Sequence, residues 1–247
     1  MSGVLAPGTQ LGHFQIEVEV GRGGMGVVYR AFDPALNRYA ALKILAPHLS
    51  GDTRALARFH REAAAAAHFK HPHIAMVYEF GEYADQPYIA SEWIAGRTLR
   101  AVLIDDGRLP LDRALPILDQ LAAALDYAHA HGVIHRDIKP ANIMISASDS
   151  ATIVDFGLAW IAATPELTAS GSLFGTPCYM SPEQIRGEPL DGRSDLYSLA
   201  VVFYELVAGR PPFDDPATPA LFYKHLAVSP PPITELNPSL PIAVSTS

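Results

Sequence analysis

Cysteine and basic side chains are scarce in this sequence, and each scarcity excludes a class of site or partner. Cys178 is the one cysteine among 247 residues, so neither an internal disulfide nor a cysteine-rich zinc cluster can form, which fits a reducing compartment. Lysine and arginine number 18 against 26 aspartates and glutamates, a formal charge of -8. Because a polyanionic backbone would meet no general basic surface, we expect no nucleic-acid partner.

Long apolar runs are also missing. Residues 1–10 contain neither a basic residue nor an apolar segment of signal-peptide length, so secretion is not expected. The most apolar stretch, Leu196 to Leu206, includes Glu205 and is shorter than the ~20 apolar residues that a membrane helix needs. We therefore expect no membrane span in this chain and a cytoplasmic location. Hydrophobic residues make up 49% of the sequence, which is enough for a sizeable core.

The chain up to residue 94 has the pattern of a small β-rich module. Alternating apolar residues and β-branched or aromatic side chains predict strands over residues 14–20, 27–29, 38–45, 74–79 and 86–93. Between the third and fourth of these strands, the alanine-rich segment 53–70 predicts a helix. Residues 1–13 form a short lead-in to this module.

The rest of the chain is mainly helical in pattern. Asp112 is the expected N-cap of a helix that ends at Gly132 and has an apolar stripe of Leu118, Leu121, Leu125 and Ala128. Two further helices are expected, over residues 193–208 and 218–227. The loop-rich region 133–183 places ionisable residues beside glycine and proline, so we expect function there. The proline-rich segment 230–241 predicts an extended surface stretch.

A glycine-rich motif, Gly21-Arg22-Gly23-Gly24-Met25-Gly26, matches the G-x-G-x-x-G pattern that brings backbone N–H groups close to phosphates. A dinucleotide-binding fold would need a helix directly after it, yet β-branched and aromatic residues follow. No Gly-Lys-Ser/Thr follows either, which excludes a Walker-type loop. Two interpretations remain at this point: a hairpin over a nucleotide, and a plain structural hairpin.

Two further motifs decide between them. Residues 135–142 read His-Arg-Asp-Ile-Lys-Pro-Ala-Asn and residues 155–157 read Asp-Phe-Gly, and both match the protein-kinase signature with its internal spacing. Lys43 in Ala-Leu-Lys follows the glycine hairpin, and Glu183 in Ser-Pro-Glu closes the segment, in the order found in kinases. The chain thus resembles the serine/threonine protein kinase family, most closely the bacterial members of the eukaryotic-like type, over about residues 14–213.

The resemblance implies an α+β, bilobal protein kinase fold. A single kinase domain is expected over residues 14–247, with a β-rich N-lobe at about 14–94 and a mainly helical C-lobe at about 95–247. Family members continue with two more helices beyond the place where this sequence ends, so the last C-lobe helices are expected to be missing. Those helices carry an arginine that pairs with the glutamate matching Glu183, which we therefore expect to be buried unpaired or exposed.

The resemblance also implies catalytic roles for single residues. Asp137 would orient the substrate hydroxyl and accept its proton, and Lys139 would neutralise the transferred phosphate. Asn142 and Asp155 would bind the Mg²⁺ (or Mn²⁺) that bridges the phosphates. Thr176 would bridge Asp137 and Lys139. A carboxylate is a weak base at neutral pH, so alignment is expected to matter more than proton removal.

ATP is the cosubstrate that the resemblance implies. Lys43 would contact its α- and β-phosphates and be held by Glu62, whose alternative role is that of a solvated helix charge. Apolar residues would enclose adenine, and Ser91 would stand at the rear of the pocket. The full expected set is Val20, Gly21, Gly23, Gly24, Gly26, Val28, Ala41, Lys43, Ser91, Glu92, Ile94 and Met144.

The expected reaction is transfer of the γ-phosphate of ATP to serine or threonine hydroxyls of protein substrates. It would include autophosphorylation of the activation segment, for which a homodimer is expected, with Thr168 and Ser170 better placed as acceptors than Thr164 and Ser172. Asp195 matches the family aspartate that braces the backbone at residues 135–136, although a simple helix N-terminal charge is an alternative. The alternative functions are an ATP-binding pseudokinase or scaffold and an inactive truncated fragment.

Overall fold

The structure of the chain, a computed structural model, describes residues 5–24, 26–46, 68–84, 86–156 and 177–241. These residues form two compact units. The first holds the described residues up to Ile94 together with Phe156, and the second holds Ala95 to Asp155 and the described residues from Pro177 onward. Among the helices of these residues, none is both long enough and apolar enough to cross a membrane.

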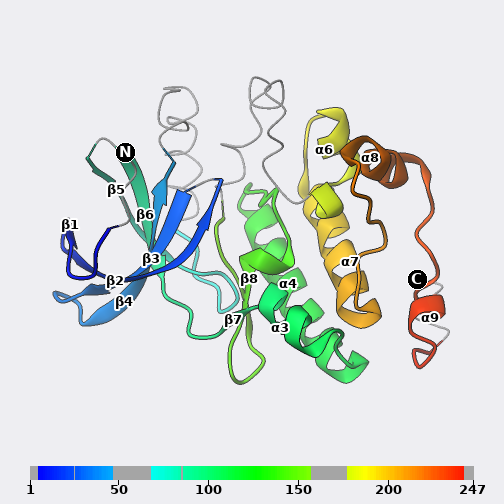
Figure 1. Cartoon of the computed structure of the whole chain (residues 1–247), viewed down its shortest axis with the longest axis horizontal. Helices are drawn as coiled ribbons and strands as arrows, with labels where there is room; N and C mark the ends of the chain where they lie inside the picture. The colour runs from blue at the N-terminus through cyan, green and yellow to red at the C-terminus, as the bar shows by residue number, and fades with distance from the viewer. Residues whose placement is uncertain (1–4, 25, 47–67, 85, 157–176, 242–247) are drawn as a thin grey trace. The chain divides into compact units, whose positions relative to one another are not determined.

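The first unit is built on an antiparallel sheet of six strands (Figure 1). In spatial order they are β1 (Gln10–Leu11), β2 (Phe14–Gly23), β3 (Gly26–Asp33), β4 (Arg38–Leu45), β6 (Gln86–Glu92) and β5 (Val77–Tyr83). The strands β2, β3, β4 and β6 lie where the alternation predicts them, whereas β5 begins three residues later than expected because Ile74 makes only an isolated bridge. The helix expected over 53–70 lies almost wholly outside the described residues.

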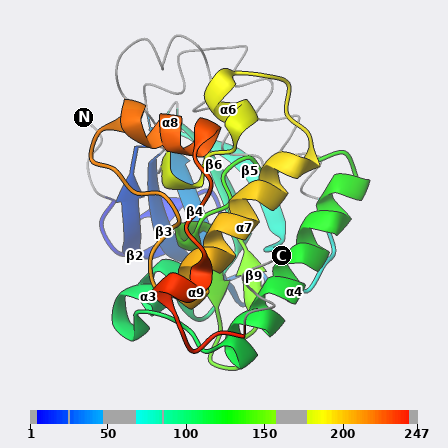
Figure 2. The same cartoon turned by 90° about the vertical axis from the view of Figure 1, so that its right-hand side faces the viewer.

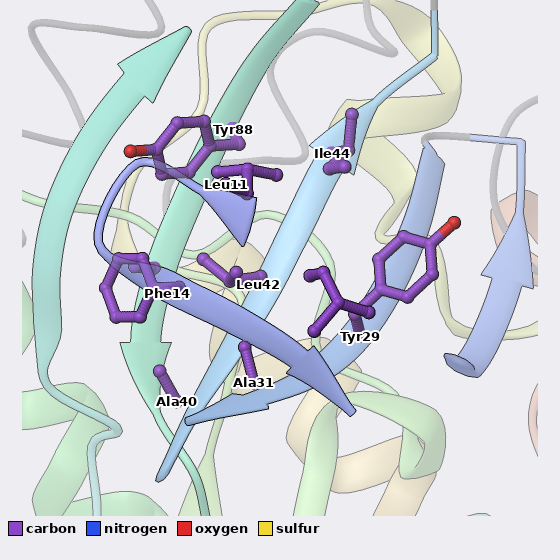
Figure 3. Close-up of a cluster of buried hydrophobic side chains, with 10 residues drawn as sticks. Leu11, Phe14, Tyr29, Ala31, Ala40, Leu42, Ile44 and Tyr88 are labelled. Carbon is purple, nitrogen blue, oxygen red and sulfur yellow. The ribbon is translucent and has the colours of Figure 1, made fainter. Parts of the chain in front are cut away.

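Alternate side chains of this sheet form one hydrophobic core (Figure 3). The core consists of Leu11, Phe14, Ile16, Tyr29, Ala31, Ala40, Leu42, Ile44, Tyr88 and Ala90, all buried. Because side chains alternate along a strand, the intervening residues of β3, β4 and β6 lie on the opposite face. The core thus determines which side chains that opposite face presents.

The second unit is mainly helical, with one small sheet of β7 (Arg97–Thr98), β8 (Ile143–Ile145) and β9 (Ala151–Ile153). Its helices are α3 (Leu99–Asp106), α4 (Leu111–Ala130), α6 (Pro182–Arg186), α7 (Gly192–Ala208), α8 (Thr218–Ala227) and α9 (Ile233–Leu236), with short 3-10 turns η1 (Pro140–Asn142) and η3 (Pro177–Tyr179). The long helices α4 and α7 pack side by side (Figure 2). Their contact forms the centre of this unit.

Two local predictions for this unit are wrong. The N-cap of α4 is Pro110, and Asp112 lies within the first turn, so the acidic side chain complements the helix dipole there and does not cap. The segment 230–241 is not uniformly extended, because it includes α9 and buries Ile233, Asn237 and Leu240. Asn237 anchors this segment by donating from Nδ2 to the Val207 carbonyl at 2.8 Å.

Candidate active site

Two polar side chains of the 135–142 loop meet at the carboxylate of Asp137. The Lys139 ammonium lies 2.7 Å from Asp137 Oδ2. Asn142 donates from Nδ2 to the same oxygen at 2.9 Å and to the Asp137 carbonyl at 2.8 Å. The Asp137 side chain is 20% exposed and the Lys139 side chain 16%, so the group is shielded but open to a reactant. This loop places a cation and an amide within hydrogen-bond distance of one carboxylate.

The backbone of this loop is held by Asp195, which lies in the first turn of α7 and is 1% exposed. Its Oδ1 accepts from Arg136 N at 2.7 Å and its Oδ2 from His135 N at 2.8 Å. Arg136 has a φ of +67°, a conformation that non-glycine residues rarely adopt. A charge-assisted pair of hydrogen bonds to two successive N–H groups therefore stabilises a strained turn directly before Asp137.

His129 and His135 complete the support of the loop. His129, on α4, contacts Asp195 Oδ2 through Nε2 at 2.7 Å. The fully buried His135 accepts from Asp137 N at Nδ1 (3.2 Å), so its Nε2 carries the proton and donates to the Val154 carbonyl at 3.0 Å. The ring of His135 thus connects the backbone of Asp137 to the strand end that leads to Asp155.

A hairpin of β8 and β9 places Asn142 and Asp155 near each other in the second unit. Asn142 directly precedes β8, and its carbonyl accepts from Val154 N at 3.0 Å, so Asp155 follows the residue that pairs with Asn142. Asp155 has a φ of +64°, a second strained backbone position at the site. The motif residues that sequence analysis assigned to metal binding therefore lie at the open end of one short hairpin.

In the first unit, the sheet face opposite to the core presents four of the residues expected to contact ATP. Val28 pairs in register with Lys43, and Ala41 pairs with Ser91, so these four side chains belong to the same face. Ser91 also donates from Oγ to the Ala41 carbonyl at 3.4 Å, at the long end of hydrogen-bond distances. Val20 on β2 is 46% exposed.

The glycines of the G-x-G-x-x-G motif differ in their surroundings. A Cβ at Gly26, whose φ is +141°, would come within 2.0 Å of the Ile44 carbonyl oxygen, so packing of the hairpin requires glycine there. At Gly21 and Gly23, by contrast, a Cβ would meet no described atom within 4 Å. Packing within the described residues does not explain these two glycines, which leaves close approach of a ligand as a reason for them.

The protein kinase domain family matches residues 14–234. The chain belongs to this family. Its predicted membership and the predicted kinase fold, with a β-rich N-lobe and a helical C-lobe, are both confirmed. Protein kinases use ATP and divalent metal ions.

Relatives of this kinase domain are found in several bacteria. It is 42% identical over 231 residues to the serine/threonine-protein kinase PknD of Mycobacterium tuberculosis, covering 94% of this chain and 35% of that protein. It is 39% identical over 233 residues to PrkC of Bacillus subtilis, covering 94% and 36%. The chain thus spans little more than a third of the length of these relatives.

Solved structures give the same fold. The kinase domain of Mycobacterium tuberculosis PknI superposes with a TM-score of 0.72 at 31% identity, covering 92% of this chain and 93% of that one. A mutant form of the PknI kinase domain gives a TM-score of 0.77 at 33% identity, covering 96% and 86%.

One expectation for the kinase domain needs correction. Glu183 is neither exposed nor unpaired, because it is half-buried and accepts from Ser194 Oγ at 2.5 Å. Burial alone would raise the pKa of Glu183, but hydrogen bonds from Ser194, from its own backbone and from Ser181 outweigh burial and hold that pKa below its ordinary value. A hydroxyl on α7 therefore supplies a partner for this carboxylate.

Several predicted residues lie outside the described part of the kinase domain. These are Glu62, Thr176 and the candidate phosphate acceptors Thr164, Thr168, Ser170 and Ser172. Lys43, Glu92 and Ile94 belong to the first unit and Met144 to the second. Glu92 donates from its backbone N–H to the Met76 carbonyl at 2.7 Å.

Two supporting residues of the kinase domain have no signal in the sequence that points to their role. His129 lies 66 residues before its partner Asp195, and Gln184 Nε2 donates at 2.8 Å to the carbonyl of Arg136, 48 residues earlier. The only local signal for Gln184 is its capping box with Ser181 at the start of α6, which explains the helix and not the contact with the loop.

Proposed function

We propose that this chain transfers the γ-phosphate of ATP to serine or threonine hydroxyls of proteins. The observation that carries the proposal is the convergence of Lys139 and Asn142 on the carboxylate of Asp137, on a loop braced by Asp195. Phosphoryl transfer depends mainly on positioning and charge neutralisation, and this loop offers both. The names of the bacterial relatives support serine and threonine as acceptors.

Each residue of this loop would have a separate role in phosphate transfer. Asp137 would accept a hydrogen bond from the substrate hydroxyl, orient its oxygen and take up its proton. Lys139, already beside this carboxylate, would place positive charge where the transferred phosphate carries negative charge. The hydrogen bonds from Asn142 to Asp137 keep the carboxylate in one orientation. The strained backbone at Arg136 is part of the same preorganisation.

The donor groups fit a divalent cation. Within the described residues, both hydrogen bonds of the Asn142 side chain use Nδ2, and none engages its Oδ1. Amide and carboxylate oxygens are ligands that Mg²⁺ accepts, so Asn142 and Asp155 would hold the ion. When bound, Mg²⁺ would neutralise charge on the phosphates. The absence of thiolate or imidazole from this pair favours Mg²⁺, with Mn²⁺ as a substitute.

ATP would bind against the first unit's sheet face of Val28, Ala41, Lys43 and Ser91. Support comes from their shared face and from the open surroundings of Gly21 and Gly23. Lys43 would contact the α- and β-phosphates and would pair with Glu62, as the family resemblance implies. We place this activity in the cytoplasm, where ATP is available and a lone cysteine stays reduced.

Regulation by autophosphorylation is part of the proposal. Thr168 or Ser170 would accept phosphate within a homodimer, one copy acting on the other. A pseudokinase or scaffold role is not favoured, because the described residues include the catalytic carboxylate, its lysine and both metal-binding side chains. The chain is therefore expected to transfer phosphate and not only to bind ATP.

The decisive experiment is incubation of the purified chain with γ-labelled ATP, Mg²⁺ and casein, followed by phosphoamino-acid analysis. Label is expected on serine or threonine of casein and on Thr168 or Ser170. Asp137→Asn and Lys43→Met should abolish it, whereas Asp119→Asn, an exposed carboxylate of α4, should not. Tight ATP binding without any transfer would overturn the proposal in favour of a scaffold.

A further inference from the structure

The β8–β9 hairpin sets the spacing between Asn142 and Asp155, yet its strands are short. Each has three residues, paired as Ile143 with Ile153, Met144 with Thr152 and Ile145 with Ala151. A slip of one residue would shift Asp155 by about 3.3 Å relative to Asn142 and turn the side chains of one strand to the other face. With so few ladder bonds between β8 and β9, contacts beyond this strand pair contribute to fixing the register.

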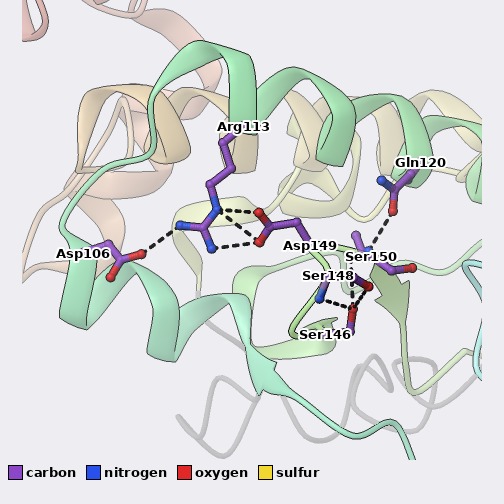
Figure 4. A network of polar contacts seen from close by, with 8 residues as sticks. Asp106, Arg113, Gln120, Ser146, Ser148, Asp149 and Ser150 are labelled. Atoms are coloured by element: carbon purple, nitrogen blue, oxygen red, sulfur yellow. Dashed lines mark hydrogen bonds and ion pairs between the residues drawn. The ribbon is translucent and has the colours of Figure 1, made fainter.

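The turn of the hairpin supplies part of this constraint (Figure 4). Ser146 Oγ accepts from the N–H groups of Ser148 (3.3 Å) and Ser150 (3.1 Å), and Ser146 N donates to the Ser150 carbonyl at 3.0 Å. Asp149 has a φ of +58°, in the left-handed region that aspartate tolerates better than most residues. The turn is compact, and its side chain at position 149 is held by another element.

That element is α4, which contacts the hairpin at two points seven residues apart. Arg113 forms a two-pronged hydrogen bond with Asp149, from Nε at 3.1 Å to each carboxylate oxygen and from Nη2 to Oδ1 at 2.9 Å. Gln120 Oε1 accepts from the N–H of Ala151, the first residue of β9, at 2.7 Å. Residues seven apart lie on the same side of a helix, so one face of α4 forms hydrogen bonds with both the turn and the strand.

Arg113 also reaches the end of α3, where Nη1 donates to Asp106 Oδ2 at 2.9 Å. Its guanidinium is thus shared between two carboxylates, and these hydrogen bonds, that of Asp149 first, raise the pKa of Arg113 further above its ordinary value despite partial burial. The charge is therefore present at every working pH. A planar guanidinium matches the carboxylate only when the turn is in one orientation.

We propose that Arg113, assisted by Gln120, is a positioning residue for the metal site, because it fixes the hairpin register that sets Asn142 against Asp155. This role rests on the proposed function, in which those two side chains bind the divalent ion. Arg113 touches neither of them and acts through Asp149 and β9. The side chains of the Arg113–Asp149 pair are 31% and 47% exposed. The pair therefore contributes little to the stability of the fold, but it fixes the orientation of the turn.

The test compares Arg113→Gln with two variants in the full chain. Arg113→Lys keeps the charge but loses the planar fork, and Ile117→Val on α4 removes one buried methylene while the hydrogen bonds from Arg113 and Gln120 to the hairpin stay in place. Binding of Mn²⁺ in the presence of a non-hydrolysable ATP analogue is followed by electron paramagnetic resonance. The Mg²⁺ concentration for half-maximal phosphate transfer and the melting temperature are measured in parallel.

Arg113→Gln is expected to weaken Mn²⁺ binding by about 10-fold, the size typical of lost support around a metal site, and to raise the Mg²⁺ requirement in parallel. Arg113→Lys should recover only part of this loss, and Ile117→Val should lower the melting temperature without changing Mn²⁺ affinity. Unchanged Mn²⁺ affinity in Arg113→Gln, or an equal loss in Ile117→Val, would overturn the proposal. If the wild-type chain transfers no phosphate but Arg113→Gln still weakens Mn²⁺ binding, the proposed function fails and the positioning role stands.

Discussion

The carboxylate of Asp195 accepts the backbone N–H of Arg136, 59 residues earlier in the chain, at 2.7 Å. This bond holds Arg136 in a left-handed conformation directly before Asp137. The stability of the second unit and the geometry of its candidate active site therefore depend on one buried carboxylate. The two properties should change together when Asp195 is altered.

We predict that Asp195→Asn is much more damaging than its small change in shape suggests. Both carboxylate oxygens accept hydrogen bonds, so an amide NH₂ would face a backbone N–H donor. Leaving a buried donor without an acceptor should lower the free energy of unfolding by about 1–3 kcal/mol. Displacement of Asp137 should reduce kcat by about 10²-fold.

Urea denaturation and steady-state kinetics measure the two effects of Asp195→Asn. The matched control is Asp191→Asn, which removes a carboxylate that is the N-cap of the same helix but is exposed. It should cost less stability and leave kcat nearly unchanged. Equal losses in the two variants would contradict the bracing role of Asp195.

A second prediction concerns Gly192 and His129. A Cβ at Gly192 would lie 2.6 Å from His129 Nδ1, so Gly192→Ala should push the imidazole away from Asp195 and cost about 1 kcal/mol of unfolding free energy. In a His129→Ala background the obstruction is gone. The same Gly192→Ala change should then stabilise the fold by up to about 0.5 kcal/mol, because alanine is the better helix residue and Gly192 is the first residue of α7, where this preference is weaker than in the interior.

Thermal and urea unfolding of the two single variants and the double variant test this reversal of sign. Additive effects would show that the ring of His129 moves aside without losing its contact with Asp195. The double-variant cycle thus isolates the close approach of Gly192 to His129 from their separate contributions to stability.

The third prediction is a pH dependence at Glu183. The pKa of this carboxyl is below its ordinary value in the folded chain, so its ionised form stabilises the fold above about pH 4.3, the usual range of glutamate, and this stability is lost as pH falls through the lowered value. Ser194→Ala removes the hydroxyl donor. We expect a deficit of about 1 kcal/mol at pH 7 that shrinks in acid.

Ser198→Ala is the control for Ser194→Ala. Ser198 is a buried serine on the same helix whose Oγ donates to a neutral acceptor, the carbonyl of Tyr179, at 2.7 Å. Its deficit in unfolding free energy should stay constant between pH 7 and pH 4. A constant deficit for Ser194→Ala as well would mean that Glu183 gains nothing specific from the hydroxyl.

Sequence reasoning predicted the parts whose cause is local. Strands β2 to β4 follow from alternation, and α8 has the predicted bounds. Asp137, Lys139 and Asn142 lie within six residues of one another, so their motif already contains the cluster that the structure displays. For such residues, spacing along the chain nearly determines spacing in the fold.

Contacts between distant segments could not be predicted in the same way. The hydrogen bonds from Arg113 to Asp149 join residues 36 apart, and the hydrogen bond from Gln184 to Arg136 joins residues 48 apart. No rule of sequence spacing predicts either contact, because tertiary packing brings the two elements together. The short helix α9 differs for another reason: the proline content predicts an extended segment, and a helix of four residues, Ile233–Leu236, is too short to show a period in the sequence.

The last prediction concerns His225 on α8, which is 5% exposed. Burial lowers its pKa. Since the folded pKa lies below that of the unfolded chain, the unfolded state binds the proton first. Stability should be full above about pH 6.5, the ordinary histidine value, and should fall as pH drops below it, by at most about 1.4 kcal/mol per pH unit for one proton.

Replacement by a neutral side chain separates this contribution from the rest of the acid response. His225→Gln cannot take up a proton, so its free energy of unfolding should change less than that of wild type between pH 7 and pH 5.5, whatever its stability at pH 7. The pKa of His71 in the first unit is also lowered by burial, and then by His73, so His71→Gln should remove a second, smaller part of the slope. Because carboxylates titrate mainly below this window, the histidines dominate it. Parallel curves for His225→Gln and wild type would mean that the folded chain protonates His225 as readily as the unfolded one.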